Sequence, residues 1–243
     1  MKTIKTQLGI FRKTLEKNTN KERAVNEKRY LKSPCKFFGV SVPFTDKMAK
    51  EFIKDNKDAE REYVFELAKR LWDSEFHEEK RLAIDILRQY PDHIDLNAMP
   101  VIEKMLEQST GWDHIDEISI HLAGTVIEKD KKAYDYLKKW SRSDNFWMRR
   151  ASLISQILLF RQGKGDHRLF FGFAEKMIEE KEFFIRKAIG WCIREISKPD
   201  PEKAFEFLQK IKGRASGLTL REGAKRLPDK MRKLILQEII LEK

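Results

Sequence analysis

The segment KEFFIRKAIGWCIREI at residues 181–196 indicates a helical fold, because its apolar residues recur with the period of an α-helix. One side of the helical wheel carries a single apolar stripe, made of Ile185, Ala188, Ile189, Cys192 and Ile196. This pattern predicts an amphipathic helix that buries the stripe in a core.

Two other segments repeat the same pattern, SEFHEEKRLAIDIL at residues 74–87 and SDNFWMRRASLISQIL at residues 143–158. Each combines an acid or amide with aromatic residues, a basic pair and an aliphatic stripe. The second bases of the pairs, Arg81, Arg150 and Lys187, are 69 and 37 residues apart, which corresponds to two steps and one step of about 35 residues. Such a period is typical of a HEAT-like α-solenoid of antiparallel helix pairs.

The composition of the 243 residues agrees with a helical protein. The chain has only 11 glycines and 7 prolines, fewer than a fold of many short strands requires, and 37% of its residues are charged, which suits solvated helix faces. We therefore expect an all-α fold, a single repeat domain over residues 1–243, and a concave basic groove. Helix starts are expected near Thr45–Asp46, Asp58, Asp144 and Pro201, and after Pro228, where the last helix would cover residues 229–240.

The charge balance favours a polyanionic partner. Fifty Lys and Arg residues against 39 Asp and Glu residues give a net charge of +11, which suits nucleic acid or an anionic membrane surface. No apolar run of about 18 residues predicts a membrane span, and the Lys-rich start lacks the apolar centre of a secretory signal. Cys35 and Cys192 are too few for a disulfide framework, so we expect a reducing, cytoplasmic location.

Lys187, Trp191 and Arg194 fall together on the side of their helix opposite the apolar stripe. A tryptophan between two cations suits a surface that contacts nucleic acid. The alternative is that Trp191 packs on a neighbouring repeat while the two cations are merely solvated.

The repeat near residues 111–124, GWDHIDEISIHLAG, offers Asp116 where the other repeats offer a base. Trp112 and Asp116 are one helical turn apart, at the edge of an aliphatic stripe, so the carboxylate would be partly desolvated beside an indole. Such a carboxylate is a candidate for catalysis. The alternative is a structural salt bridge from Asp116 to a base such as Arg150.

Arg150 lies within the apolar stripe of its own helix, whereas Arg149 points elsewhere. A charge on the inner side must be paired or must face a polar cavity. Arg150 could therefore hold a phosphate through its guanidinium fork or pair with an acid. His114 and His121 share a helical face but lack a third ligand at metal spacing, so no metal site is expected.

From about residue 5 to 230, the chain resembles the bacterial HEAT-repeat DNA alkylation-repair glycosylases, the AlkD-like family. The resemblance rests on seven segments: RYLK (29–32), FFGV (37–40), LWDS (71–74), GWDHID (111–116), SDNFWMRRA (143–151), KEFFIRKAIGWCIRE (181–195) and LREGAKRL (220–227). Members of this family excise positively charged N3- and N7-alkylated purines from DNA. The chain differs at Gly111, where a bulkier residue is expected, and this difference bears on substrate preference.

The resemblance implies roles for five residues. Asp116 matches the catalytic carboxylate and Arg150 the essential arginine, while Trp112 and Trp191 match the aromatic residues that flank the deoxyribose of the lesion. Tyr30 matches an aromatic residue near the DNA.

The resulting expectation is a monomeric, monofunctional DNA glycosylase without cofactor or metal. Its partner would be double-stranded DNA with alkylated bases and not a membrane, and a basic rim would bind the backbone through Lys187, Arg194 and Arg221. Two alternatives are a non-catalytic HEAT-like module that binds nucleic acid and a protein-interaction scaffold.

Overall fold

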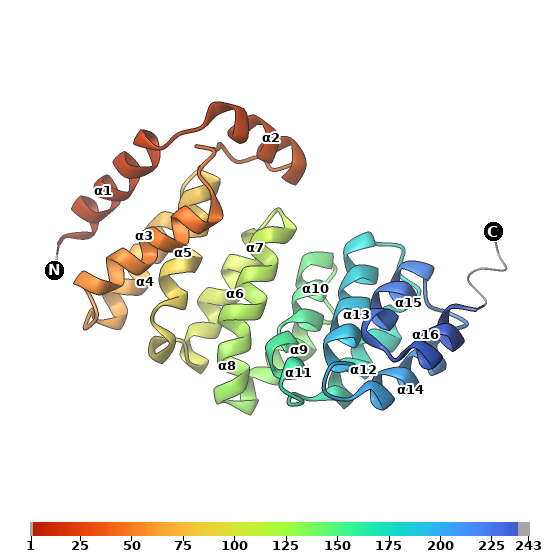
Figure 1. Cartoon of the computed structure of the whole chain (residues 1–243). Coiled ribbons are helices and arrows are strands. Elements are labelled where there is room, and N and C mark those ends of the chain that lie inside the picture. Colours follow the sequence, from red (N-terminus) through yellow and green to blue (C-terminus); the bar gives the residue numbers. More distant parts are fainter. Residues whose placement is uncertain (1, 238–243) are drawn as a thin grey trace. The chain divides into compact units, whose positions relative to one another are not determined.

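The computed structural model describes residues 2–237, which form helices joined mostly by short loops (Figure 1). Over this range β-structure is limited to an isolated bridge between Lys36 and Phe76, so the prediction of an all-α fold is confirmed. None of the described helices is both long and apolar enough to cross a bilayer. The chain divides into two compact units, unit 1 up to Ile118 and unit 2 from Ser119 onward. The single domain expected from the sequence stays a prediction.

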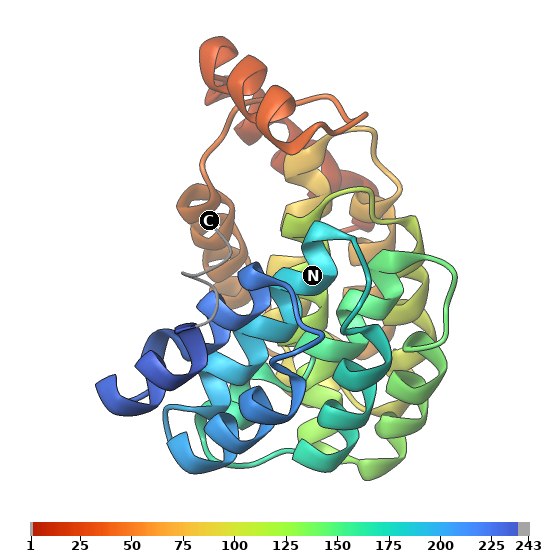
Figure 2. The same cartoon turned by 90° about the vertical axis from the view of Figure 1, so that its right-hand side faces the viewer.

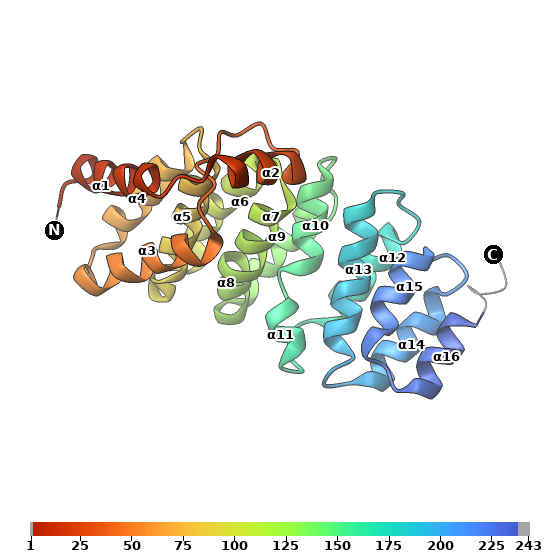
Figure 3. The same cartoon turned by 45° about the horizontal axis from the view of Figure 1, so that its top comes forward.

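The α-helices of unit 1 are α1 (Ile4–Lys17), α2 (Lys21–Leu31), α3 (Val42–Asp55), α4 (Arg61–Trp72), α5 (His77–Arg88), α6 (Met99–Gln108) and α7 (Trp112–Glu117). Two short 3₁₀ turns, η1 (Pro91–His93) and η2 (Leu96–Ala98), join α5 to α6. α5 packs against both α3 and α4, and nearly all of its side chains are buried. α1 lies along α4 (Figure 3).

The segment that follows α2 is held mainly through its backbone. Every residue of α2 is described and none has a buried side chain. The buried carboxylate of Glu78 on α5 accepts three backbone N–H groups at 2.6–3.1 Å, from Phe38, Gly39 and Val40. Gly39 has a φ of +78°, and a Cβ there would be 2.1 Å from the carbonyl oxygen of Asn20, so this position requires glycine. These contacts fix the chain between α2 and α3.

The α-helices of unit 2 are α8 (Gly124–Lys129), α9 (Tyr134–Trp140), α10 (Phe146–Ile154), α11 (Ile157–Arg161), α12 (His167–Met177), α13 (Phe183–Ile196), α14 (Pro201–Ile211), α15 (Gly217–Gly223) and α16 (Asp229–Leu236). The 3₁₀ turns η4 (Lys131–Ala133) and η5 (Ala224–Arg226) precede α9 and α16. α13 is central in this unit, with contacts to α10, α11, α14 and α15 (Figure 2). The predicted apolar stripe of α13 is fully buried.

Polar contacts between residues about one repeat apart recur along the chain. Side chains pair across 34 to 36 residues in both units, at Arg61–Asp95, Trp72–Gln108, Arg161–Glu195, Lys187–Glu222 and Lys210–Glu175. The segments that repeat in the sequence become α5, α10 with α11, and α13. The helical-repeat class predicted from the sequence period is therefore confirmed, and the period is visible in contacts as well as in the apolar stripes.

One expected helix start is wrong. α3 begins at Val42 after Ser41, so Thr45 lies inside the helix, where it is buried and donates a hydrogen bond to Asp85 at 2.8 Å. Pro43 in the first turn explains the earlier start. Backbone N–H groups in the first turn of a helix have no acceptor within the helix, so a proline there costs no hydrogen bond. The other expected starts lie within three residues of the observed ones. Residues 238–240 of the expected last helix lie outside the described residues.

Candidate active site

Tyr30 and Trp112 come together in unit 1. Their rings meet edge to face, with centroids 6.1 Å apart and planes at 89°. Tyr30 is 72% exposed, so this aromatic pair is open to solvent. Beside it lies a cavity of about 160 Å³, which is lined in part by Tyr30, Trp112, His77, Arg81 and Asp113.

Asp116 lies one turn after Trp112 on α7, so the two side chains leave the helix on the same side. Both residues are half-buried. α7 passes directly into a π-helical segment, η3 (Ile118–Ala123), and then into α8. Such π-helical turns within α-helices are frequent at functional sites.

The first turn of α7 is tied to α5 by a buried hydrogen bond. Nε2 of His77 lies 2.6 Å from Oδ2 of Asp113. Burial opposes the ionisation of Asp113, but the hydrogen bond with His77 and the field of His114 outweigh it and lower the pKa of Asp113 to about 2. The rings of His77 and His114 stack with centroids 4.3 Å apart. This anchor fixes the start of the helix that carries Trp112 and Asp116.

The burial of His114 predicts a pH-dependent stability. Burial, followed by the field of His77, lowers the pKa of His114 from 6.5 to about 3. The unfolded chain therefore binds a proton that the folded chain does not, and stability falls as the pH drops from about 6.5 towards 3, by at most about 1.4 kcal/mol per pH unit. His114→Phe should remove this slope, which urea unfolding at several pH values in the presence of EDTA would measure.

Above pH 7, His114 is neutral in the folded and the unfolded state. The difference in the free energy of unfolding between the wild type and His114→Phe then reflects only the change in packing. His77, Asp113, Arg81 and Lys80 are the charged or titratable groups that act on His114, and the variant retains all of them. An identical pH dependence in the wild type and the variant would contradict the assignment.

Arg150 in unit 2 is buried, as its place in the apolar stripe predicted, with 3% of its surface exposed. Its Nη1 donates to the backbone carbonyl of Phe184 at 2.6 Å, and its guanidinium carbon lies 5.7 Å from the centroid of that ring. The neighbouring Arg149 points elsewhere and forms a two-pronged pair with Glu180 at 2.8 and 3.0 Å. The first turn of α13 therefore helps to set the position of Arg150.

Lys187, Trp191 and Arg194 share a face of α13, but the two cations are not simply solvated. Nζ of Lys187 lies 2.5 Å from a carboxylate oxygen of Glu222 on α15, and Arg194 pairs with the same carboxylate. The side chain of Glu222 is only 3% exposed. Burial, with the fields of Arg194 and Arg150, lowers the pKa of Lys187. Arg150 thus belongs to the same electrostatic cluster.

Trp191 is held in a fixed orientation by a buried acid on its own helix. Its Nε1 donates to Glu195 at 3.1 Å. The side chain of Glu195 is 2% exposed and also pairs with Arg161, at 2.7 Å, and with Lys198, at 2.5 Å. The indole itself is half-buried, so part of the ring remains accessible.

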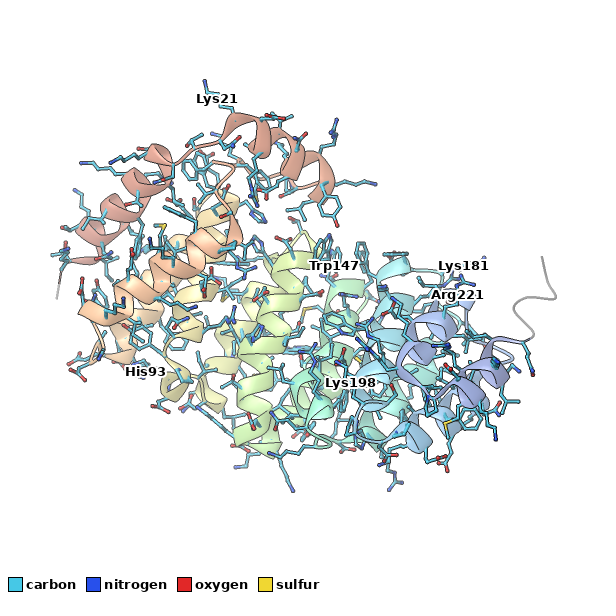
Figure 4. All side chains as sticks on the ribbon, viewed as in Figure 1. Lys21, His93, Trp147, Lys181, Lys198 and Arg221 are labelled. Atoms are coloured by element: carbon cyan, nitrogen blue, oxygen red, sulfur yellow. The ribbon has the colours of Figure 1, made fainter. Side chains whose placement is uncertain are left out.

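Arg221 on α15 is exposed, and its guanidinium folds back over Gly217 at the start of that helix. Among residues 2–237, no carboxylate pairs with Arg221. Figure 4 shows Arg221 and Lys181 at the end of unit 2 where Trp147 lies, whereas Lys198 lies at the other end of α13. Arg221 is therefore available to an external anion.

The structure gathers the predicted residues in two sets. Unit 1 brings together Tyr30, Trp112 and Asp116. Unit 2 brings together Arg150, Lys187, Trp191 and Arg194 on and around α13, with Arg221 on α15, which packs against α13.

The acids and the histidine that hold these residues in place are not evident from the pattern of any single helix. Glu222 follows Lys187 by 35 residues and Asp113 follows His77 by 36, in each case one repeat period. A search of the sequence for an acid one repeat after Lys187 and after His77 would have found Glu222 and Asp113. Glu195 follows Trp191 by four residues, a spacing that also indicates contact on a helix.

Residues 11–227 match the model of the family described as DNA alkylation repair enzyme. The chain belongs to this family. The match covers every predicted site residue, in both units. No curated protein matches the chain.

Solved structures agree with this family assignment. A predicted DNA alkylation repair enzyme from Enterococcus faecalis is 25% identical, with a TM-score of 0.78 over 87% of this chain and 97% of its own. AlkD2 from Streptococcus mutans is 17% identical, with a TM-score of 0.59 over 77% of this chain and 91% of its own. The smu.31 protein of Streptococcus mutans UA159 is also 17% identical, with a TM-score of 0.57. The last two likenesses concern the fold alone. Family membership gives the chain a role in DNA alkylation repair.

Proposed function

We propose that this DNA alkylation repair protein is a monofunctional glycosylase that hydrolyses the N-glycosidic bond of cationic N3- and N7-alkylpurines in double-stranded DNA. The observation that carries the proposal is Asp116, a half-buried acid one turn from Trp112 in a chain of this family. The exposed Tyr30 beside Trp112 adds an aromatic surface at the same place.

The chemistry of the lesion suits a carboxylate that acts without a general acid. An N3- or N7-alkylated purine already carries a positive charge, so it leaves without prior protonation. The enzyme then has to stabilise the positive charge that develops on the deoxyribose and to position a water molecule. Asp116 would perform both tasks.

The aromatic and basic residues would bind the DNA substrate. Trp112 and Trp191 would place electron-rich ring faces beside the cationic sugar and base, each contributing about 0.5–2 kcal/mol. Arg150 would hold a phosphate and set the register of the backbone. Lys187, Arg194 and Arg221 would add affinity that depends on salt and not on sequence.

The proposed chemistry needs neither a cofactor nor a closed pocket for the base. Strand cleavage would require a lysine nucleophile, and the proposed catalytic residues, Asp116, Arg150, Trp112 and Trp191, include none. Lys187 is assigned to backbone binding and pairs with Glu222, so the phosphodiester backbone would stay intact. The base would remain largely outside the protein, so that bulky cationic adducts are tolerated. The protein would act as a monomer on chromosomal DNA in the cytoplasm.

The test is to incubate the purified protein with randomly methylated duplex DNA and to identify the released bases by mass spectrometry. We expect 7-methylguanine and 3-methyladenine, and no release of a neutral lesion such as hypoxanthine. Steeply salt-dependent DNA binding without base release would instead indicate a non-catalytic nucleic-acid-binding module. Absence of DNA binding would indicate a protein-interaction scaffold.

Arg221→Ala should weaken DNA binding by a nearly uniform factor for all sequences. Because Arg221 is exposed and pairs with no acid among the described residues, its contact with a phosphate would release about one counterion. The slope of log affinity against log salt should therefore fall by about one. Fluorescence anisotropy with a duplex oligonucleotide at several salt concentrations would measure it.

Lys210→Ala is the matched control for Arg221→Ala, because Lys210 on α14 already pairs with Glu175 on α12. The control should leave the salt slope unchanged. An unchanged slope in Arg221→Ala would remove this residue from the proposed interface.

A further inference from the structure

His77, Asp113 and His114 form a compact cluster in unit 1, and the proposed reaction gives none of them a role. His77 begins α5, and the other two residues lie in the first turn of α7. One potential ligand atom of each residue lies within 4.8 Å of the others. Nε2 of His77 is 2.6 Å, and Nε2 of His114 is 4.0 Å, from the same oxygen of Asp113.

His114 supplies a second, independent observation. Its side chain is 4% exposed, and within the described part of the chain its Nε2 has no hydrogen-bond partner. A buried polar atom without a partner is rare in native proteins and calls for an explanation. An imidazole nitrogen next to a carboxylate and a second imidazole is suited to bind a metal.

We propose that His77, Asp113 and His114 bind one divalent transition-metal ion, with Zn²⁺ the best match to two imidazoles and one carboxylate. The sequence predicted no metal site, because His114 and His121 share a helix face without a third ligand. The fold supplies the missing ligands from elsewhere: His77 from the preceding repeat, 37 residues before His114, and Asp113 from the adjacent position.

The surroundings provide a route to this site and a fourth ligand position. His77 and Asp113 line the cavity of about 160 Å³ beside Trp112. Zinc sites with three protein ligands complete their coordination with water, which this cavity could supply. Water would therefore reach the ion from the cavity beside Trp112, whereas the buried His114 would shield the opposite side of the ion from solvent.

Two cations lie near the cluster, but both are already engaged. Arg81 pairs with Asp85 at 3.0 Å and with Glu117 at 3.3 Å. Lys80 donates to the backbone carbonyl of Trp72. Their charges are thus partly offset, and Asp113 supplies a negative charge at the ion itself.

Coordination would change the local geometry in a measurable way. Ligand atoms of a tetrahedral zinc site lie about 3.3 Å apart, given metal–nitrogen distances of about 2.0–2.1 Å. Nε2 of His114 would approach Asp113 by less than 1 Å from its present 4.0 Å. The rings of His77 and His114, now stacked with an angle of 19° between their planes, would have to tilt apart. The ring NMR signals of these two histidines should therefore shift when metal is added.

A bound ion would also link α5 to the first turn of α7. Free metal in excess over its dissociation constant stabilises the folded state, so Zn²⁺ should raise the melting temperature and EDTA should reverse the rise. This effect is independent of base excision, so the metal site and the glycosylase proposal can fail separately.

The test uses the full chain after removal of metals by chelation. Calorimetric titration with Zn²⁺, and Co²⁺ titration followed by visible absorption, should each show one equivalent bound to the wild type. His77→Gln and His114→Phe should each weaken binding by at least about tenfold, because each removes one of three ligands. His93→Gln, which removes a histidine outside the cluster, should bind like the wild type.

Each variant is first compared with the wild type in EDTA by circular dichroism, so that loss of folding is not mistaken for loss of a ligand. If His114→Phe fails to fold, Asp113→Asn provides the same test with a nearly isosteric side chain. The proposal is overturned if the wild type binds no stoichiometric Zn²⁺, or if folded variants bind it as tightly as the wild type does.

Discussion

Replacing Asp116 with asparagine should slow the release of 7-methylguanine from methylated DNA by about two to three orders of magnitude. Asparagine keeps the shape of the half-buried side chain but removes the negative charge that would stabilise the developing sugar cation. Removing one negative charge from a DNA-contacting surface should leave binding unchanged or make it tighter. Mass spectrometry of the released base and anisotropy with undamaged duplex would measure the two effects separately.

Glu117→Gln is the matched control for Asp116→Asn, because it neutralises the next acid of the same helix. Glu117 pairs with Arg88 at 3.0 Å and with Arg81 at 3.3 Å, so its role is structural. We expect this control to keep most of the excision rate. Excision at the wild-type rate by Asp116→Asn would refute the role assigned to Asp116.

Replacing Glu222 with glutamine should lower the free energy of unfolding by about 2–3 kcal/mol. The buried carboxylate of Glu222 is shared by Lys187, Arg194 and Lys225. Glutamine would leave these cations close together without a counter-charge. The loss is smaller than for a fully buried pair, because the cationic side chains are 23% to 57% exposed and water screens them. Urea unfolding at neutral pH would measure it.

The control for Glu222→Gln is Glu175→Gln, which neutralises the acid of the exposed pair with Lys210. This control should lower the free energy of unfolding by less than about 1 kcal/mol. Equal denaturant midpoints for Glu222→Gln and the wild type would show that the acid does not hold this cluster together.

The helical repeat could be predicted from the sequence because one physical rule governs it. Residues that recur every three or four positions must be buried together, and the stripe of α13 from Ile185 to Ile196 is indeed fully buried. The same rule predicted that the side chain of Arg150 is buried, and Arg150 is 3% exposed. The spacing of Trp112 and Asp116 likewise predicted that both side chains leave α7 on one side.

The partners of these residues could not be predicted, because helical periodicity describes one helix at a time. Glu222 meets Lys187, and His77 meets Asp113, only after successive repeats stack. The start of α3 was misplaced for a related reason, since Thr45 and Asp46 are typical N-cap residues in isolation. In the fold Thr45 is instead buried in the helix and binds Asp85 of α5.

The arrangement of charges in unit 2 bears on how such a protein binds DNA without becoming unstable. Lys187 and Arg194 lie close together, and buried acids stabilise their positive charges. Glu222 pairs with both cations, and Glu195 pairs with Arg194. Arg221, on the same helix as Glu222, is left exposed. On α13 and α15, cations that are paired with buried acids therefore occur together with the exposed Arg221.

The most direct test of the proposed function is single-turnover excision from a duplex that carries one 7-methylguanine at a defined position. We expect an alkali-labile site to form at that position far faster than by spontaneous depurination, with release of the free base and with a strand that stays intact until alkali is added. A duplex that is bound by the protein but loses its 7-methylguanine no faster than the protein-free sample would contradict the proposed function.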